Sequence, residues 1–166
     1  MKHLTYILLL LILPLTLSHK VGASTTVQNQ DVIIIDKVKH KLNKPLLFQL
    51  DSATYFTLRE RLDFRSSTFS WNFRGHVATF EVKDNKIYLN SIESSSVHND
   101  FNSLLDKYMD KNGRVFASWV SGTFICGTGG CLHVEPDGLF PVYEQETELV
   151  VEAGVVVSSR TYTNRI

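Results

Sequence analysis

The chain has 166 residues, and its 17 lysines and arginines balance 17 aspartates and glutamates. A charge this close to neutral gives no reason to expect nucleic acid or a strongly anionic membrane surface as the partner. The length suits a single domain that is large enough to bury a substantial core.

The first residues have the pattern of a secretory signal peptide. A short basic start is followed by the apolar run Leu4–Leu17 and then by the small residues Val21–Ala23. This order is typical of an export signal that is cleaved after Ala23, and the run is short for a membrane span of roughly 20 residues. The sequence therefore predicts a periplasmic or secreted protein that is not integral to the membrane after cleavage. An uncleaved N-terminal anchor is the alternative.

The predicted organisation is a signal peptide over 1–23, a polar tail over 24–30 and one β-rich domain over 31–166. Cleavage removes Lys2 and Lys20 and no acidic residue, which leaves 143 residues with 15 basic and 17 acidic side chains. The net charge of the exported chain is then −2, the difference between these two counts.

The first half of the domain alternates between strand and helix signals. The β-branched run within Asp31–Asp36 predicts a strand, and the apolar spacing of three and four after Asp51 predicts a short helix ending near Leu62. A strand is the alternative for this second segment, because Thr54, Phe56 and Thr57 also suit one. Residues 71–83 and 86–92 have strand composition, and Asp84-Asn85 between them suits a two-residue hairpin turn.

The second half contains one amphipathic segment followed by strands. His98–Met109 carries apolar residues on one helical face and ends before Asn112-Gly113, a helix-stop signal. Strands are predicted over Arg114–Cys126 and Cys131–Glu135, with a turn over Pro136–Gly138. Glu144–Val157 then alternates acidic and apolar residues, which predicts a strand with one face toward water.

These elements predict an α+β fold with a strongly bent antiparallel sheet, or a partly open β-barrel, and one or two helices. Short turns join most neighbouring strands, which favours antiparallel pairing. An all-β sandwich is the alternative architecture.

The two cysteines lie close together in the segment Cys126-Gly-Thr-Gly-Gly-Cys131. In an exported protein such a pair predicts a disulfide, here one that clamps the tip of a hairpin. A redox pair or a metal site is the alternative, but redox motifs usually have two intervening residues and His133 is the only nearby further ligand.

The segment Trp71–His76 is the first candidate binding region. In a strand, Arg74 and His76 share one face and Trp71 and Phe73 share the other. A guanidinium can bind a carboxylate or phosphate, and an exposed Trp is a common anchor for a partner. Alternatively, Trp71 and Phe73 belong to the core while Arg74 and His76 are solvated.

Trp119, His133 and Glu135 are the remaining candidate binding residues. Trp119 is either core or part of an aromatic binding face. His133 and Glu135 share a strand face, as a general base and its orienting carboxylate would, but chance placement on an exposed hairpin is the favoured explanation. The sequence contains no catalytic or metal-binding motif, so no catalytic residue, metal ligand or cofactor is predicted.

Four short segments resemble an uncharacterised family of exported bacterial proteins. Its members carry a Trp-Arg-Gly-Tyr, Ala-Thr-Trp-Glu, Leu-Tyr-Leu series and then a Phe-Ala-x-Trp segment. The matching residues here are Phe73-Arg74-Gly75-His76, Ala78-Thr79-Phe80-Glu81, Ile87-Tyr88-Leu89 and Phe116-Ala117-Ser118-Trp119. Phe replaces Trp twice and His replaces Tyr, and the match covers about a third of the chain. The resemblance implies a β-rich fold and no established activity.

Three functions follow from these observations. The first is a non-catalytic protein that binds another protein outside the cytoplasm, such as an inhibitor or immunity protein against a toxin or a cell-wall hydrolase. The second is a binder of a small apolar ligand, with Trp71, Arg74 and Trp119 at the mouth of a pocket. The third is a hydrolase that uses His76 or His133.

Overall fold

The computed structural model describes residues 29–64, 72–94, 100–134 and 141–165. Within these ranges eight strands form one sheet in the order β3-β1-β2-β6-β7-β8-β4-β5, and an additional β3–β4 pairing closes the circuit of hydrogen bonds. The strands are β1 (Val32–Ile35), β2 (Val38–Leu42), β3 (His76–Lys83), β4 (Lys86–Ser94), β5 (Val115–Phe116), β6 (Gly122–Val134), β7 (Pro141–Glu152) and β8 (Val155–Thr163).

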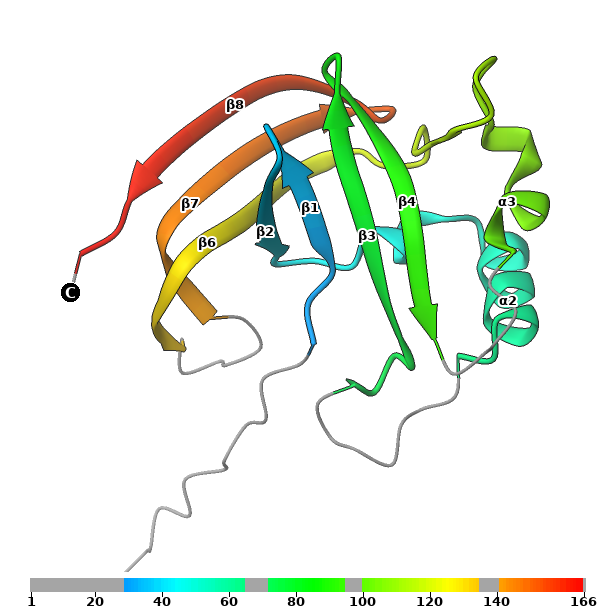
Figure 1. Ribbon diagram of the computed structural model, residues 1–166, viewed down its shortest axis with the longest axis horizontal. Coiled ribbons are helices and arrows are strands. Elements are labelled where there is room, and N and C mark those ends of the chain that lie inside the picture. The colour runs from blue at the N-terminus through cyan, green and yellow to red at the C-terminus, as the bar shows by residue number, and fades with distance from the viewer. Residues whose placement is uncertain (1–28, 65–71, 95–99, 135–140, 166) are drawn as a thin grey trace, which may run out of the picture.

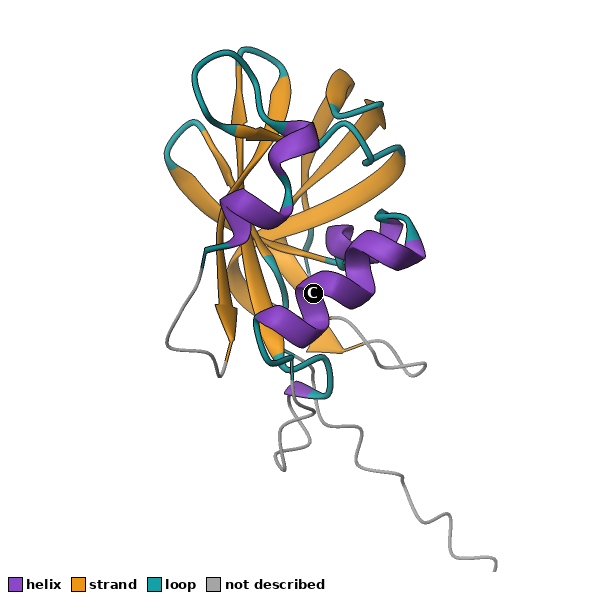
Figure 2. Cartoon of the chain, turned by 90° about the vertical axis from the view of Figure 1, so that its right-hand side faces the viewer, coloured by secondary structure: helices purple, strands orange, loops and turns teal. Residues whose placement is uncertain are grey.

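The sheet bends strongly around the core, and the helices lie beside it (Figure 1). The helices are the 3₁₀ turn η2 (Leu46–Gln49), α2 (Ser52–Arg61), α3 (Phe101–Leu104) and the 3₁₀ turn η4 (Asp106–Tyr108). Seen from the side, α2 and α3 cover one flank of the strands (Figure 2). The predicted α+β fold with a strongly bent sheet is therefore confirmed. One pairing, between β1 and β3, is parallel, and the others are antiparallel.

Three two-residue turns connect hairpins of this sheet. Asp36-Lys37 joins β1 to β2, Asp84-Asn85 joins β3 to β4, and Ala153-Gly154 joins β7 to β8. All six residues have positive φ, which is the conformation that matches the right-handed twist of the flanking strands. The turn at Asp84-Asn85 was predicted. The other two were missed because Lys and Ala are not typical left-handed residues.

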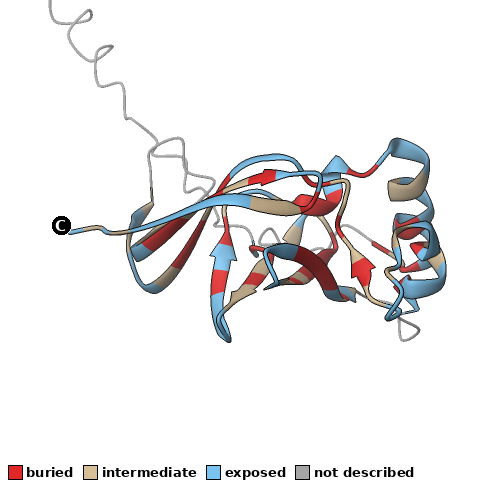
Figure 3. Ribbon diagram, turned by 90° about the horizontal axis from the view of Figure 1, so that it is seen from above, coloured by how far each residue is buried: buried red, intermediate tan, exposed pale blue. Residues whose placement is uncertain are grey.

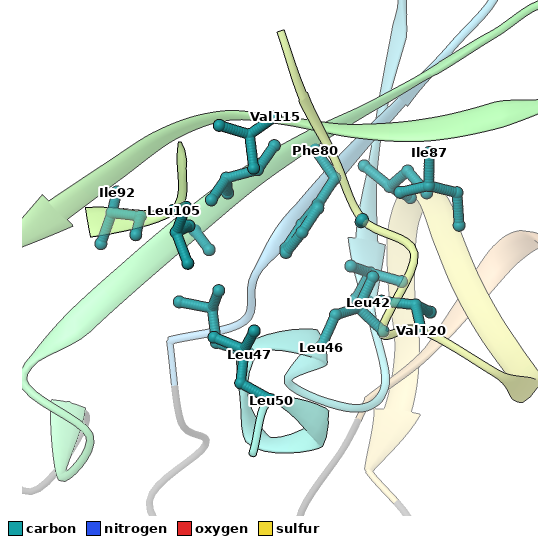
Figure 4. Close-up of a cluster of buried hydrophobic side chains, with 14 of the residues drawn as sticks. Leu42, Leu46, Leu47, Leu50, Phe80, Ile87, Ile92, Leu105, Val115 and Val120 are labelled. Atoms are coloured by element: carbon teal, nitrogen blue, oxygen red, sulfur yellow. The ribbon is translucent and has the colours of Figure 1, made fainter. Parts of the chain in front are cut away.

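The core lies between the concave side of the sheet and the helical segments (Figure 4). Leu46 and Leu47 of η2 and Leu58 of α2 are fully buried, as are Phe80 of β3 and Ile87 of β4. The helix predicted to start at Asp51 is confirmed, and the Asp51 carboxylate accepts the Thr54 N–H at 2.9 Å as its N-cap.

Some elements differ from the predicted ones. The helix predicted over 98–109 is limited to the short turns α3 and η4, and residues 95–99 and the turn predicted at 136–138 lie outside the described residues. The basic segment after Asp36 forms β2, in which His40 and Leu42 face inward while the lysines face water. Hairpin pairing with β1 therefore outweighs the weak strand composition of this segment.

The predicted disulfide between Cys126 and Cys131 is wrong, because both cysteines are free thiols. The segment between them is not a hairpin tip. It runs within the single strand β6, and five residues of extended chain span roughly 16 Å, far beyond the Cα separation of about 4.4–6.8 Å that a disulfide allows. Cys126 is fully buried and its Sγ lies 3.4 Å from the Thr147 carbonyl, whereas Cys131 is exposed.

The glycines of this segment admit side chains from the neighbouring strand β7 rather than forming a tight turn. A Cβ on Gly127 would lie 2.1 Å from Cδ2 of Tyr143, so the ring packs directly on the backbone of β6. The Glu144 carboxylate lies over the next glycines and accepts the Gly130 N–H at 2.9 Å. Close approach of β7 therefore explains why a side chain is absent here.

The two thiols should differ sharply in reactivity. Burial raises the pKa of Cys126 to about 12, so this thiol stays protonated, while Cys131 is open to solvent. We expect iodoacetamide to label one cysteine in the native protein and both after denaturation without reductant, as counted by intact mass spectrometry. Failure of the denatured protein to label at either position would instead indicate a disulfide.

Candidate functional site

A buried ion pair joins the two parallel strands at their start. Asp31 immediately precedes β1, its side chain is fully buried, and its Oδ1 lies 3.1 Å from a guanidinium nitrogen of Arg74. The same oxygen accepts the Ala78 N–H of β3 at 3.0 Å, and Arg74 also donates to the Asn29 carbonyl. Asp31 and Arg74 thus connect the entry of the chain into the sheet with the beginning of β3.

His76 is the third member of this group, which we call the Asp31–Arg74–His76 cluster. His76 is fully buried, and its Nδ1 lies 3.1 Å from the Arg74 carbonyl. A carbonyl only accepts, so this contact assigns the proton to Nδ1 and leaves Nε2 as an acceptor. Neither Nε2 of His76 nor Oδ2 of Asp31 has a hydrogen-bond partner among the described residues.

Aromatic rings extend from this cluster to the surface. Phe64 stacks on His76 with ring centroids 4.2 Å apart, and Phe48 lies 6.4 Å from His76. Phe48 meets Tyr55 edge to face at 5.3 Å, and Tyr55 in turn contacts Phe56 at 6.2 Å. Phe48 and Phe56 are 53% and 54% exposed. We call Phe48, Tyr55 and Phe56 the aromatic patch.

The elements that carry the aromatic patch are fixed by a helix cap, an ion pair and buried leucines. Asp51 caps α2, which carries Tyr55 and Phe56, and it also forms an ion pair with Lys107 of η4 at 3.0 Å. Leu46 and Leu47 are buried and fix η2 in the core, so the exposed Phe48 projects toward solvent from a short, well-packed turn. The patch therefore presents exposed rings on rigid elements, which lowers the entropy lost when a partner binds.

Protonation of His76 should destabilise the fold. Burial lowers the pKa of His76, although the nearby Asp31 carboxylate opposes that effect. In the unfolded chain His76 has its ordinary pKa near 6.5, so as the pH falls through this value the unfolded chain binds a proton that the folded chain does not. The free energy of unfolding is therefore highest above about pH 7 and decreases as the pH falls below that value. We expect the urea midpoint to decrease between pH 7.5 and 5.5, and to decrease less in His76→Phe.

His40 contributes to the same measurement. Burial also lowers the pKa of His40, so His76→Phe should reduce the pH dependence without abolishing it. An unchanged pH dependence in His76→Phe would show that protonation of His76 does not destabilise the fold.

The alternative in which Phe73 belongs to the core while Arg74 and His76 are solvated is wrong. Phe73 is 65% exposed, whereas the Arg74 side chain is 14% exposed and His76 is fully buried. The strand begins at His76 because Gly75 has a φ of +72°, which places Arg74 in the preceding turn. Trp71 lies outside the described residues.

The other candidates do not join this cluster. The Trp119 indole N–H donates to the Leu46 carbonyl at 3.2 Å, and its ring meets Tyr108 at 4.7 Å, so it packs against the core. His133 is exposed on β6, and Glu135 lies outside the described residues. A pocket of about 360 Å³ lies elsewhere, between the helices, and is lined by Arg61, Leu62, Asp100, Ser103 and Leu104.

Sequence reasoning missed Asp31 and the aromatic patch. Asp31 has the same strand parity as Ile33, which is fully buried, so alternation alone could have placed this carboxylate on the inward face. Phe48 and Phe56 carried no comparable signal, because apolar residues in a short turn and a helix are expected to be buried. Their exposure depends on how η2 and α2 pack.

Comparison of the chain with protein-family models, with curated proteins and with solved structures found no match. Within the described ranges, no helix has both the length and the apolar character needed to cross a bilayer. The Asp31–Arg74–His76 cluster and the aromatic patch are therefore the features of the chain that bear on its function.

Proposed function

We propose that this chain is an exported, non-catalytic protein that binds another protein through the aromatic patch. The observation that carries the proposal is the pair of rings of Phe48 and Phe56, each more than half exposed and joined through Tyr55. Exposed apolar clusters of this kind are typical of interaction sites, and aromatic residues supply much of the binding energy at such sites.

The Asp31–Arg74–His76 cluster supports the patch and does not take part in chemistry. His76 is fully buried beneath Phe64, so its free Nε2 has no contact with solvent from which a substrate could reach it. Arg74 is already paired with Asp31 and has little charge to offer a ligand. These contacts favour a structural role for the residues that a hydrolase would need.

The compartment follows from the export signal predicted over residues 1–23. The partner is then a protein of the periplasm or the outside medium, and we propose a toxin or cell-wall hydrolase that this chain inhibits. An inhibitor needs a rigid surface and no catalytic group. The capped helix α2 and the packed turn η2 provide such a surface.

Affinity capture from the native host tests the proposal. The double variant Phe48→Ser/Phe56→Ser is expected to capture less partner than the tagged unmodified chain, because removing both rings removes the centre of the interface. Val38→Ser is the matched control, since Val38 is 48% exposed on β2, away from the patch. We expect one stoichiometric protein with the unmodified chain and Val38→Ser, and its loss by at least about tenfold with the double variant.

The activity of the captured protein then tests whether the chain inhibits a toxin or a cell-wall hydrolase. If it has toxin or wall-hydrolase activity, adding the purified chain should inhibit that activity, and the double variant should not. A protein captured equally by the double variant would show that the patch is not the interface. A partner whose activity is unaffected would exclude inhibition.

A further inference from the structure

Strand β8 leaves most of one edge without a partner strand. β8 pairs with β7 along its whole length, but on its other side it pairs with β4 only at Val155–Lys86. The Val156 N–H donates to the Asn85 carbonyl at 2.8 Å, and beyond it no strand in the described part of the chain reaches β8. The strand lies along the outside of the sheet and ends near the C-terminus (Figures 1 and 3).

The direction of the backbone groups along β8 follows from two contacts. The Asn164 N–H donates to the Glu144 carbonyl at 2.9 Å, which marks these residues as a hydrogen-bonded pair. Hydrogen-bonded and non-hydrogen-bonded pairs alternate, so Thr161, opposite Thr147, belongs to a non-bonded pair. Their hydroxyls lie 2.9 Å apart, as the closer spacing of such a pair allows. The N–H and C=O groups of residues 159, 161 and 163 therefore point away from β7.

Beyond the bulge at Val157, this edge lacks the features that normally prevent strand addition. Residues 155–163 read Val-Val-Val-Ser-Ser-Arg-Thr-Tyr-Thr, with no Pro or Lys and with Arg160 as the one charged side chain. Natural edge strands are commonly protected by prolines, lysines or inward charges. An open edge with strong β-propensity and three outward residues is suited to receive another strand.

We propose that the partner of this edge is β8 of a second copy of the chain, in an antiparallel dimer with a two-fold axis at Thr161. In this register Thr161 faces its own equivalent and Ser159 faces Thr163. The backbone N–H and C=O groups of all these residues point outward, so each facing pair can form hydrogen bonds between the two copies. The two sheets then continue into one another across the axis.

Side-chain charge favours this register over its neighbours. It places Arg160 beside Tyr162 of the second copy, where the guanidinium can lie on the ring, and within its own chain Arg160 is opposite Glu148. A register centred on Arg160 would oppose two like charges. A register centred on Ser159 would require Val155 and Val156, which already contact β4 and Asn85.

Sedimentation equilibrium of the purified chain tests the dimer. Ser159→Pro removes one outward N–H from each copy without removing a bond to β7, so it should weaken dimerisation by at least about tenfold. Ser159→Val keeps the N–H and should dimerise as the unmodified chain does. A chain that stays monomeric at high micromolar concentration, or a Ser159→Pro variant that dimerises normally, overturns the proposal.

Cysteine crosslinking tests the register even if Ser159→Pro does not fold. In a Cys131→Ser background, Thr161→Cys should form a covalent dimer under mild oxidation because the two Cα atoms lie within disulfide range at the axis. Ser159→Cys is the matched control and should not, since its equivalent is four residues out of register. Equal crosslinking at both positions would contradict the proposed register, and a different protein crosslinked to Thr161→Cys would replace the second copy as the occupant. The dimer is independent of the aromatic patch.

Discussion

Replacing Arg74 by Met is expected to lower the free energy of unfolding by about 3–5 kcal/mol, the largest effect of any substitution considered. The reason is the Asp31 carboxylate, which is fully buried and has Arg74 as its ion-pair partner at 3.1 Å. Without the guanidinium this charge remains buried, and the Ala78 N–H is its one remaining donor among the described residues. Urea unfolding of the purified variant measures the loss.

A double variant separates the buried charge from the lost packing of the Arg74 side chain. Asp31→Asn removes the charge and keeps an oxygen to accept the Ala78 N–H, so Asp31→Asn/Arg74→Met should be more stable than Arg74→Met alone. If the double variant is instead less stable than either single variant, the ion pair is not the reason for the loss. An Arg74→Met chain within about 1 kcal/mol of the unmodified protein would also contradict it.

Replacing Gly154 by Ala is expected to cost about 3 kcal/mol. Gly154 has a φ of +80°, and an added Cβ would lie 2.6 Å from the Ala117 carbonyl oxygen, a backbone atom that cannot move aside. Left-handed backbone strain contributes about 1–2 kcal/mol and the clash a similar amount. The β7–β8 turn packs this closely because the Gly154 N–H donates to the Val120 carbonyl at 2.7 Å.

Gly113 offers the matched control for this prediction. It has a similar φ of +74°, but an added Cβ would meet nothing within 4 Å. Gly113→Ala therefore measures backbone strain alone and should cost about 1–2 kcal/mol. Thermal and urea unfolding of the two variants side by side give the difference. Equal losses would mean that the contact with Ala117 does not matter.

Much of the fold could be predicted from local patterns. The β-branched run of β1, the Asp84-Asn85 turn and the apolar spacing after Asp51 each specify their element without long-range information. The parallel pairing of β1 with β3 could not be predicted, because it joins residues that are more than forty positions apart. The ion pair depends on that pairing, so the sequence indicated Arg74 and His76 but not their buried partner Asp31.

The cysteines show the opposite error, in which a local pattern was overinterpreted. Three glycines between two cysteines are typical of a tight loop, yet here they let Tyr143 and Glu144 approach an extended strand. The signal that distinguishes the two cases lies on the neighbouring strand β7. A pattern confined to residues 126–131 could not contain it.

Photo-crosslinking from the aromatic patch is the most direct test of the central claim, that this surface binds an extracytoplasmic protein. A photoreactive phenylalanine analogue is placed at Phe56 in one strain of the native host and at Val38 in another, since the two side chains are similarly exposed at 54% and 48%. We predict an adduct with one extracytoplasmic protein from position 56 and none from position 38. Equal adducts from both positions, or no adduct from position 56 while a protein still co-purifies, would contradict the claim.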